Sequence, residues 1–150
     1  MAGRSQGIAL VMASAAALMQ VSCVERAPLR PDVRVEGAWV RAVAGPDANT
    51  AAYMILRNAG SAPDRLTGAR CEASRVAELH RTTIDTAGLA RMERVEALVL
   101  PAESAVEMQP GGYHLMLMGI GQLVQGDTIG ITLELETFGP VEVSAEVRAF

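Results

Sequence analysis

The segment GGYHLMLMG (111–119) combines a strand-like alternation with residues that can bind a metal. Alternate residues of a β-strand point to opposite faces, so Leu115 and Leu117 share one face while His114 and Met116 share the other. At that spacing, the imidazole and the thioether project about 6–7 Å apart along the chain. Two side chains at this separation can coordinate the same metal ion.

A second histidine and a second methionine lie upstream in strand-like surroundings. In AELHR, Leu79 is expected to face inward and His80 outward. In ARMER, Met92 is flanked by Arg91 and Glu93, which argues against a place in the middle of a dry core. His80 and His114 are the only histidines of the chain. Both histidines and both methionines are therefore candidate ligands.

The ligand types favour one metal ion. Thioether sulfur is soft and neutral, binding Cu(I) well and Zn²⁺, Mg²⁺ or Ca²⁺ poorly. Two imidazoles alone would suit Zn²⁺ or Cu(II), whereas two imidazoles with two thioethers favour Cu(I). Such a site also stays intact in an oxidising compartment, where thiolates are lost to disulfides.

Composition and motifs exclude several other functions. The net charge is −4 and there is no basic run, which argues against nucleic acid as a partner. The sequence has no G-x-S-x-G turn, no H-E-x-x-H and no glycine-rich phosphate loop, so we do not expect an enzyme. Half of the residues are hydrophobic, enough for a buried core in one domain.

The N-terminal region has the composition of a leader. Residues 1–22 carry one arginine and then an apolar, alanine-rich stretch, which is typical of a secretory signal peptide; a buried N-terminal helix is the alternative. Residues 23–32 have the composition of a linker, and residues 33–150 form the expected folded domain. We expect an exported, periplasmic protein.

The two cysteines leave alternatives open. Cys23 follows the leader where a bacterial lipoprotein is acylated, but Gln20 occupies the position that usually carries leucine. Cys23 is thus either a lipid anchor, which would be the chain's only membrane contact, or unmodified. A bridge from an unmodified Cys23 to Cys71 has no support from the sequence, and Cys71 is expected to be a small buried hydrophobe.

Short strands separated by turn residues dominate the rest of the chain. Turn signals recur about every ten residues, which is typical of a β-sandwich or barrel. The clearest hairpin joins TIGITLELE (128–136) to VEVSAEVRAF (141–150), and PAESAVEM could instead form a short helical turn. In QPGG, Pro110 and Gly111 suit a type II turn, which would hold His114 near a rim. Earlier strands are expected over 33–43, 51–58, 65–72, 75–84, 89–95 and 104–109.

The spacing of the four candidate ligands resembles a family motif. His80, eleven residues, Met92, twenty-one residues, then His114-x-Met116 is similar to the motif of PCuAC-type periplasmic copper chaperones. The resemblance covers residues 33–148. It also includes AWVRA (38–42), AAYM (51–54), DRLTGA (64–69), AELH (77–80) and PGGYHLMLMG (110–119).

The resemblance implies a fold, a cofactor and a role. It implies an all-β, cupredoxin-like Greek-key sandwich with a Cu(I) site at one end, built from the four matching residues. It also implies a monomeric metallochaperone that carries copper by ligand exchange toward the CuA or another copper centre of cytochrome oxidase, with an oxidase subunit or assembly factor as acceptor. Two departures from the family are Arg81, where many members carry a methionine, and the chain end at Phe150 without a His- and Met-rich tail. A second copper site is therefore not expected.

Two other functions compete with the chaperone. A blue-copper electron carrier needs a cysteine thiolate, and Cys71 precedes both histidines instead of lying just before the second. A metal-free adhesion or structural sandwich predicts that no copper binds. The remaining side chains are assigned by pattern: Met118 to a hydrophobic wall or a further ligand, Met54, Met108 and Trp39 to the core, and Tyr113 to structure. Glu78 and Asp85 are assigned to a solvated face, from which either could orient His80.

Overall fold

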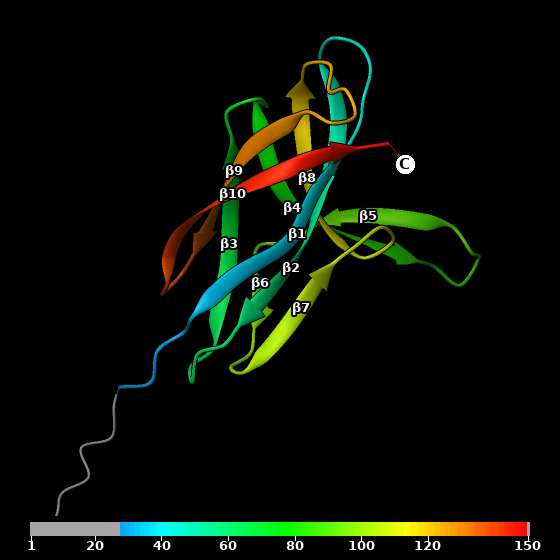
Figure 1. Ribbon diagram of the computed structural model, residues 1–150. Coiled ribbons are helices and arrows are strands. Elements are labelled where there is room, and N and C mark those ends of the chain that lie inside the picture. The colour runs from blue at the N-terminus through cyan, green and yellow to red at the C-terminus, as the bar shows by residue number, and fades with distance from the viewer. Residues whose placement is uncertain (1–27, 150) are drawn as a thin grey trace, which may run out of the picture.

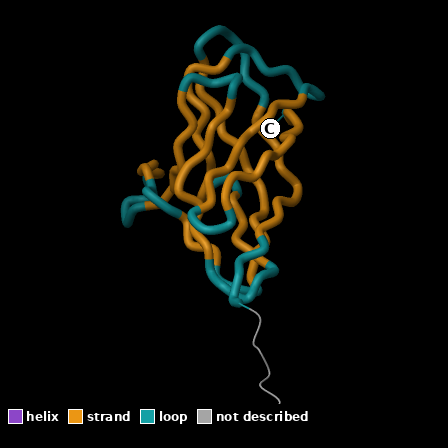
Figure 2. The backbone as a smooth tube through the Cα atoms, turned by 90° about the vertical axis from the view of Figure 1, so that its left-hand side faces the viewer, coloured by secondary structure: helices purple, strands orange, loops and turns teal. Residues whose placement is uncertain are grey.

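A computed structural model describes residues 28–149, and this region is built of strands and loops with no helix (Figure 2). None of its segments is therefore a helix long and apolar enough to cross a membrane. The predicted signal peptide and Cys23 lie outside the described residues.

Ten strands follow one another along the described chain. They agree closely with the predicted strands, and the segment that could have formed a helical turn is the strand β7. The three-residue β6 was missed, because a strand so short shows no usable alternation. The strands are β1 (Val33–Arg41), β2 (Ala48–Asn58), β3 (Asp64–Cys71), β4 (Val76–Ile84), β5 (Ala90–Arg94), β6 (Leu98–Leu100), β7 (Ser104–Met108), β8 (Tyr113–Ile120), β9 (Thr128–Leu135) and β10 (Gly139–Arg148).

The strands form two layers that share one core (Figure 1). The pairing order is β5-β4-β8-β2-β1-β10-β9-β3-β6, with β7 on β2, and the parallel pair β1–β10 links the two layers. Chain segments such as β2 to β3 and β8 to β9 cross between layers. The predicted all-β, cupredoxin-like Greek-key sandwich is confirmed.

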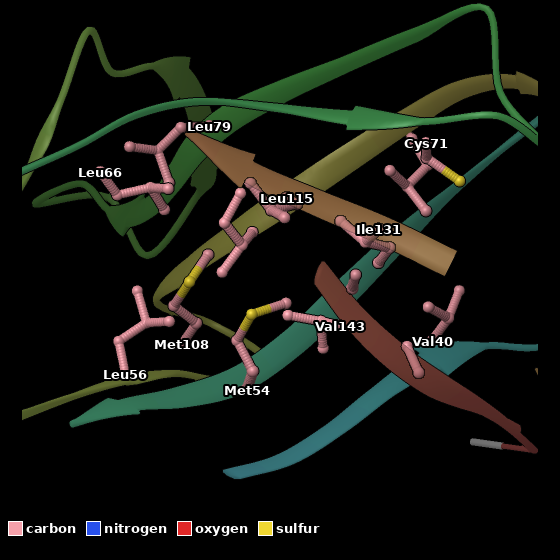
Figure 3. Close-up of a cluster of buried hydrophobic side chains, with 14 of the residues drawn as sticks. Val40, Met54, Leu56, Leu66, Cys71, Leu79, Met108, Leu115, Ile131 and Val143 are labelled. Atoms are coloured by element: carbon pink, nitrogen blue, oxygen red, sulfur yellow. The ribbon is translucent and has the colours of Figure 1, made fainter. Parts of the chain in front are cut away.

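The core lies between the layers, and burial alternates regularly along β9 and over most of β10. Leu115 and Leu117 of β8 are fully buried, as are Ile131 and Leu133 of the predicted C-terminal hairpin β9–β10. Figure 3 shows side chains of the two layers pointing toward one another, with Met54 and Met108 among them. Burying a side chain of this size stabilises the fold by roughly 1.5–3 kcal/mol.

One hairpin extends beyond the sandwich. β5 pairs only with β4, and all of its residues are exposed, so the β4–β5 arm projects from the body in Figure 1. Asp85 holds the turn of the arm, because its side chain accepts hydrogen bonds from the backbone N–H groups of Ala87 and Leu89 and pairs with Arg91. These bonds lower the pKa of Asp85, the Leu89 N–H having the largest effect.

Candidate metal centre

The two histidines are direct neighbours on adjacent strands. β4 and β8 pair antiparallel with His80 opposite His114, and directly opposite residues share a face. Their ring centroids are 5.9 Å apart. The preceding residue of β4, Leu79, is buried in the core, as predicted, so both imidazoles lie on the outer face of this layer.

One nitrogen of the His80 ring makes a hydrogen bond, and the other has no hydrogen-bond partner within residues 28–149. Nε2 lies 2.9 Å from Oε2 of Glu78, which shares the same face of β4. A carboxylate only accepts, so Nε2 carries the proton and Nδ1 offers a lone pair. Nδ1 is buried and has no hydrogen-bond partner within residues 28–149. Glu78, and not Asp85, therefore orients His80.

His114 has the same arrangement with the nitrogens exchanged. Its Nδ1 lies 3.2 Å from the carbonyl oxygen of Gly112, and its buried Nε2 has no partner in the described part of the chain. The turn before β8 supplies this carbonyl, since Gly112 N–H bonds Gln109 O at 2.9 Å and Gly111 has φ 81°, as predicted. The Gly112 carbonyl thus accepts the Nδ1–H hydrogen bond and fixes the ring, which leaves the lone pair of Nε2 available to bind a metal.

Burial disfavours the charged form of the His114 ring. The residue is only 3% exposed, and this desolvation lowers the pKa of its imidazole below the ordinary value of 6.5. The Gly112 carbonyl partly opposes the shift, and the nearby His80 adds to it. The pKa of Glu78 is lowered in turn, mainly by its hydrogen bond to His80. A neutral imidazole is the form that binds metal.

The two methionines reach the site from different strands. Met116 lies two residues after His114 on the same face of β8 and opposite Glu78. Met92 lies on β5 opposite Thr82, which shares the face of His80. Both methionines and His114 line one cavity of about 630 Å³. His80 is not among the residues that line it, although its ring centroid is 5.9 Å from that of His114.

The other sequence assignments divide into two groups. Met54, Met108 and Cys71 are buried in the core, as predicted. Trp39 is not: it is half-buried and stacks on Tyr53 at 4.6 Å, so its expected role as a core anchor is wrong. The reason is a β-bulge between Glu36 and Trp39, which shifts the register of β1 against β2.

Sequence reasoning missed Tyr53 and Arg41 as neighbours of the site. Tyr53 lines the cavity, and its ring centroid is 6.2 Å from that of His114. Arg41 lines the same cavity from the end of β1. The alternation of Ala51 and Tyr53 in AAYM was visible, but which strand would lie beside β8 was not.

Two side chains lie outside the cavity. Arg81 is the residue after His80, so it projects to the opposite side of β4, where its guanidinium lies 5.3 Å from the ring centre of Tyr113. A methionine at this position would not share the face of His80. Met118 shares the face of Met116 but is not among the residues that line the cavity.

The donor set discriminates between metals. No group of three or more His, Cys, Asp or Glu side chains within the described residues could hold a metal ion, so the hard-ion and zinc patterns are not met there. Cys71 is a free cysteine in the core, whereas the histidines lie on the outer face, so it is not placed as the thiolate of a blue-copper site. Two imidazole nitrogens with two thioethers fit Cu(I).

Sequence comparison connects the chain with lipoproteins. The model of the family "LpqE-like: Putative lipoprotein LpqE-like" matches residues 33–147. The "Putative lipoprotein Lxx21020" of Leifsonia xyli subsp. xyli is 32% identical over 119 residues, which are 79% of this chain and 70% of the relative.

Structural comparison connects it with copper-binding domains. The copper-bound PCuAC domain from PmoF2 is 30% identical with a TM-score of 0.65, over 79% of this chain and 93% of that domain. The solution structure of apo-DR1885 from Deinococcus radiodurans is 33% identical with a TM-score of 0.60, over 99% and 97% of the two chains. The Cu(I) form of DR1885 is 34% identical with a TM-score of 0.59, over 85% and 83%.

Proposed function

The chain belongs to the LpqE-like, PCuAC-type family, and we propose that it is a copper chaperone that binds Cu(I) through His80, Met92, His114 and Met116. Copper is the cargo of this protein and leaves by ligand exchange. The proposed role is transport, without a catalysed reaction.

One observation carries the proposal. Nδ1 of His80 and Nε2 of His114 are buried lone-pair donors without a hydrogen-bond partner in the described residues. Leaving a buried polar atom unsatisfied costs about 1–3 kcal/mol. Two such atoms on neighbouring rings, one of which lines a cavity together with two methionines, would be explained by a ligand that accepts their lone pairs. A soft cation fits this need.

The mechanism follows from how firmly each donor is held. The histidine rings are fixed by Glu78 and by the Gly112 carbonyl, so they keep their direction when copper leaves. The methionine thioethers are neutral and weakly basic, so each can depart without taking up a proton. Exchange therefore begins at the cavity, where Met92 is exposed, and the histidine pair releases copper last.

Location and acceptor extend the proposal. The lipoprotein names of the family and of the Leifsonia relative support an exported protein. We propose that it is tethered by an acylated Cys23 and acts as a monomer on the periplasmic side of the membrane. The acceptor would be the CuA or another copper centre of cytochrome oxidase, or an assembly factor for it.

The test is competition for Cu(I) with a colorimetric chelator under reducing conditions. We expect the wild type to retain one Cu(I), and the double variant Met92→Ile/Met116→Ile to lose it at a much lower chelator concentration. Met118→Ile is the matched control, since Met118 lies on the same face outside the cavity lining, and should behave like the wild type. Equal, weak retention by wild type and double variant would reject the proposal.

A further inference from the structure

The outer edge of β5 has no strand partner among residues 28–149. β5 stands at one end of the pairing order, pairs only with β4, and has all of its residues exposed. The arm in Figure 1 therefore presents an open strand edge. Such an edge carries unpaired N–H and C=O groups that can pair with a strand of another chain.

The backbone groups on this edge belong to alternate residues. On the β4 side, the Leu89 carbonyl accepts a hydrogen bond from Asp85 N–H at 2.9 Å, and Val95 N–H donates to the Leu79 carbonyl at 2.8 Å. Both backbone groups of a residue point to the same side of an antiparallel strand. The odd-numbered residues from Leu89 to Val95 therefore pair with β4, and the free edge is formed by the residues between them: Ala90, Met92 and Arg94.

The charges along β5 are self-complementary in one register. In an antiparallel pair of two β5 strands centred on Met92, Arg91 lies opposite Glu93 of the second copy, and Glu93 lies opposite its Arg91. Opposite charges at directly opposed positions stabilise a strand pair. A pair centred on Arg91 or on Glu93 would instead oppose two like charges. Centring on Met92 also brings the edge-facing backbone groups of the two strands together.

Both charges are available for this pairing. Glu93 lies opposite Arg81 of β4, but the Arg81 guanidinium packs on Tyr113, and Glu93 makes no hydrogen bond or ion pair within the described residues. Arg91 donates from Nε to Asp85 at 3.0 Å. Its side chain is 72% exposed, and a guanidinium carries five N–H donors, so the Nη groups can still bind a carboxylate.

We propose that a second copy of this chain docks on the free edge of β5 in this register, and that Cu(I) passes between the copies through the two Met92 thioethers. The passage of copper rests on the proposed function. Directly opposite residues share a face, with Cβ atoms about 4.5–5.5 Å apart, so Met92 of the second copy joins the face of His80. β5 has five residues, whereas stable interfaces use about 20–30 a side, so the contact is transient and the resting chain stays a monomer.

The exchange step conserves charge and electrons. The thioether sulfur of Met92 of the second copy donates an electron pair to Cu(I), and Met92 of the first copy leaves with its own pair. No proton moves, and copper stays monovalent. Because the same type of ligand enters and leaves, copper can spread among identical copies without a loss of free energy.

The first test is disulfide trapping of the apo-protein with oxidised glutathione. Each variant also carries Cys23→Ser, since Cys71 is buried and Cys23 would compete. Met92→Cys should form a linked dimer at least about tenfold faster than Leu89→Cys. The paired Cα atoms at position 92 would lie about 5.5 Å apart, within reach of a disulfide, and those at position 89 about 20 Å apart. Leu89 is the matched control because it is exposed on the same arm.

Charge reversal tests the register. Met92→Cys/Glu93→Arg and Met92→Cys/Arg91→Glu each oppose like charges in a pair of identical copies, so trapping should slow roughly three- to tenfold at low salt. A mixture of the two variants restores both opposite-charge pairs and should recover the rate. Alkylation by neutral iodoacetamide corrects for a change in the reactivity of the introduced cysteine.

The passage of copper is measured between a Cu(I)-loaded chain and an isotope-labelled apo chain, followed by NMR under reducing conditions. We expect a rate that rises with the concentration of apo chain and slows roughly three- to tenfold when both chains carry Glu93→Arg. Loss of copper to neutral neocuproine should be unchanged. Glu72→Arg, the same change of charge in an exposed turn after β3, is the matched control and should behave like the wild type.

The outcomes separate the two proposals. If the wild type retains no Cu(I), the proposed function fails, and disulfide trapping still tests the docking. If it retains Cu(I) but Met92→Cys is trapped no faster than Leu89→Cys, the docking is wrong and the copper site stands. Trapping without recovery in the mixture would overturn the register. Equal copper exchange in the wild type and Glu93→Arg would overturn the passage of copper through this edge.

Discussion

The histidine pair on β4 and β8 and the edge strand β5, which carries Met92, would hold the same proposed metal from regions with opposite mechanical properties. His114 lies on β8 between β4 and β2, is 3% exposed, and is held by a backbone carbonyl. Met92 lies on an edge strand that pairs with one neighbour, and it is 54% exposed. The contrast predicts that affinity resides in the imidazoles and release at Met92 on β5.

The largest expected effect comes from the buried histidine. His114→Gln should weaken Cu(I) binding by at least about 100-fold, because even loss of an outer partner of a ligand typically costs 10–100-fold. Competition against a chelator of known affinity measures it. A loss no greater than that of Met92→Ile would contradict the division between a histidine pair that holds copper and a methionine on β5 that releases it.

Met92→Ile should weaken binding less, by about tenfold, or ~1.4 kcal/mol. The same variant should accelerate the first step of copper transfer, since the ligand that leaves first is already missing. Stopped-flow transfer to a chelator checks the rate, with Leu89→Ile as a control for a change at an exposed residue of the same arm. Slower transfer from Met92→Ile would oppose the exit role.

Glu78→Gln tests how firmly His80 is oriented. The amide can still accept the Nε2–H bond at 2.9 Å but lacks the charge, so we expect a loss of about tenfold in affinity. Glu93→Gln on the exposed arm is the matched control. Equal affinities for both variants would show that the carboxylate does not support the ring.

The smallest effect is a pH dependence of the apo-protein. The pKa of His114 is lowered in the folded state, so the unfolded chain binds more protons below about pH 6.5. The contribution of His114 to stability is complete above the pKa that it has in the unfolded chain. It is lost as the pH falls through the lower pKa that it has in the folded protein. The lowered pKa of Glu78 changes the stability only at pH values below its ordinary pKa of 4.5. The free energy of unfolding measured with urea should fall between about pH 7.5 and about pH 5.5, and this fall should be smaller in His114→Gln. An equal fall in that variant would contradict the assignment to His114.

Local pattern was enough to predict much of the fold. The alternation around His114 separated its face from that of Leu115, and the chemistry of Pro110 and Gly111 predicted the turn that supplies the Gly112 carbonyl. These features depend on residues near one another in the chain. The C-terminal hairpin was predictable for the same reason.

Features that depend on distant pairings could not be derived in this way. No local pattern places His80 opposite His114, because the β4–β8 register is set by burial on both strands. The bulge that moves Trp39 out of the core, and the arrival of Arg41 at the cavity, depend on how β1 meets β2. The spacing of the family motif predicted the four candidate ligands without explaining how they meet.

The most direct test of the account is X-ray absorption at the copper edge of the Cu(I)-loaded protein. We predict a monovalent edge with two nitrogen and two sulfur neighbours, and loss of one sulfur neighbour in Met92→Ile. A first shell without sulfur, or a shell unchanged in His114→Gln, would contradict a site built from the fixed imidazole pair and the exchangeable thioethers.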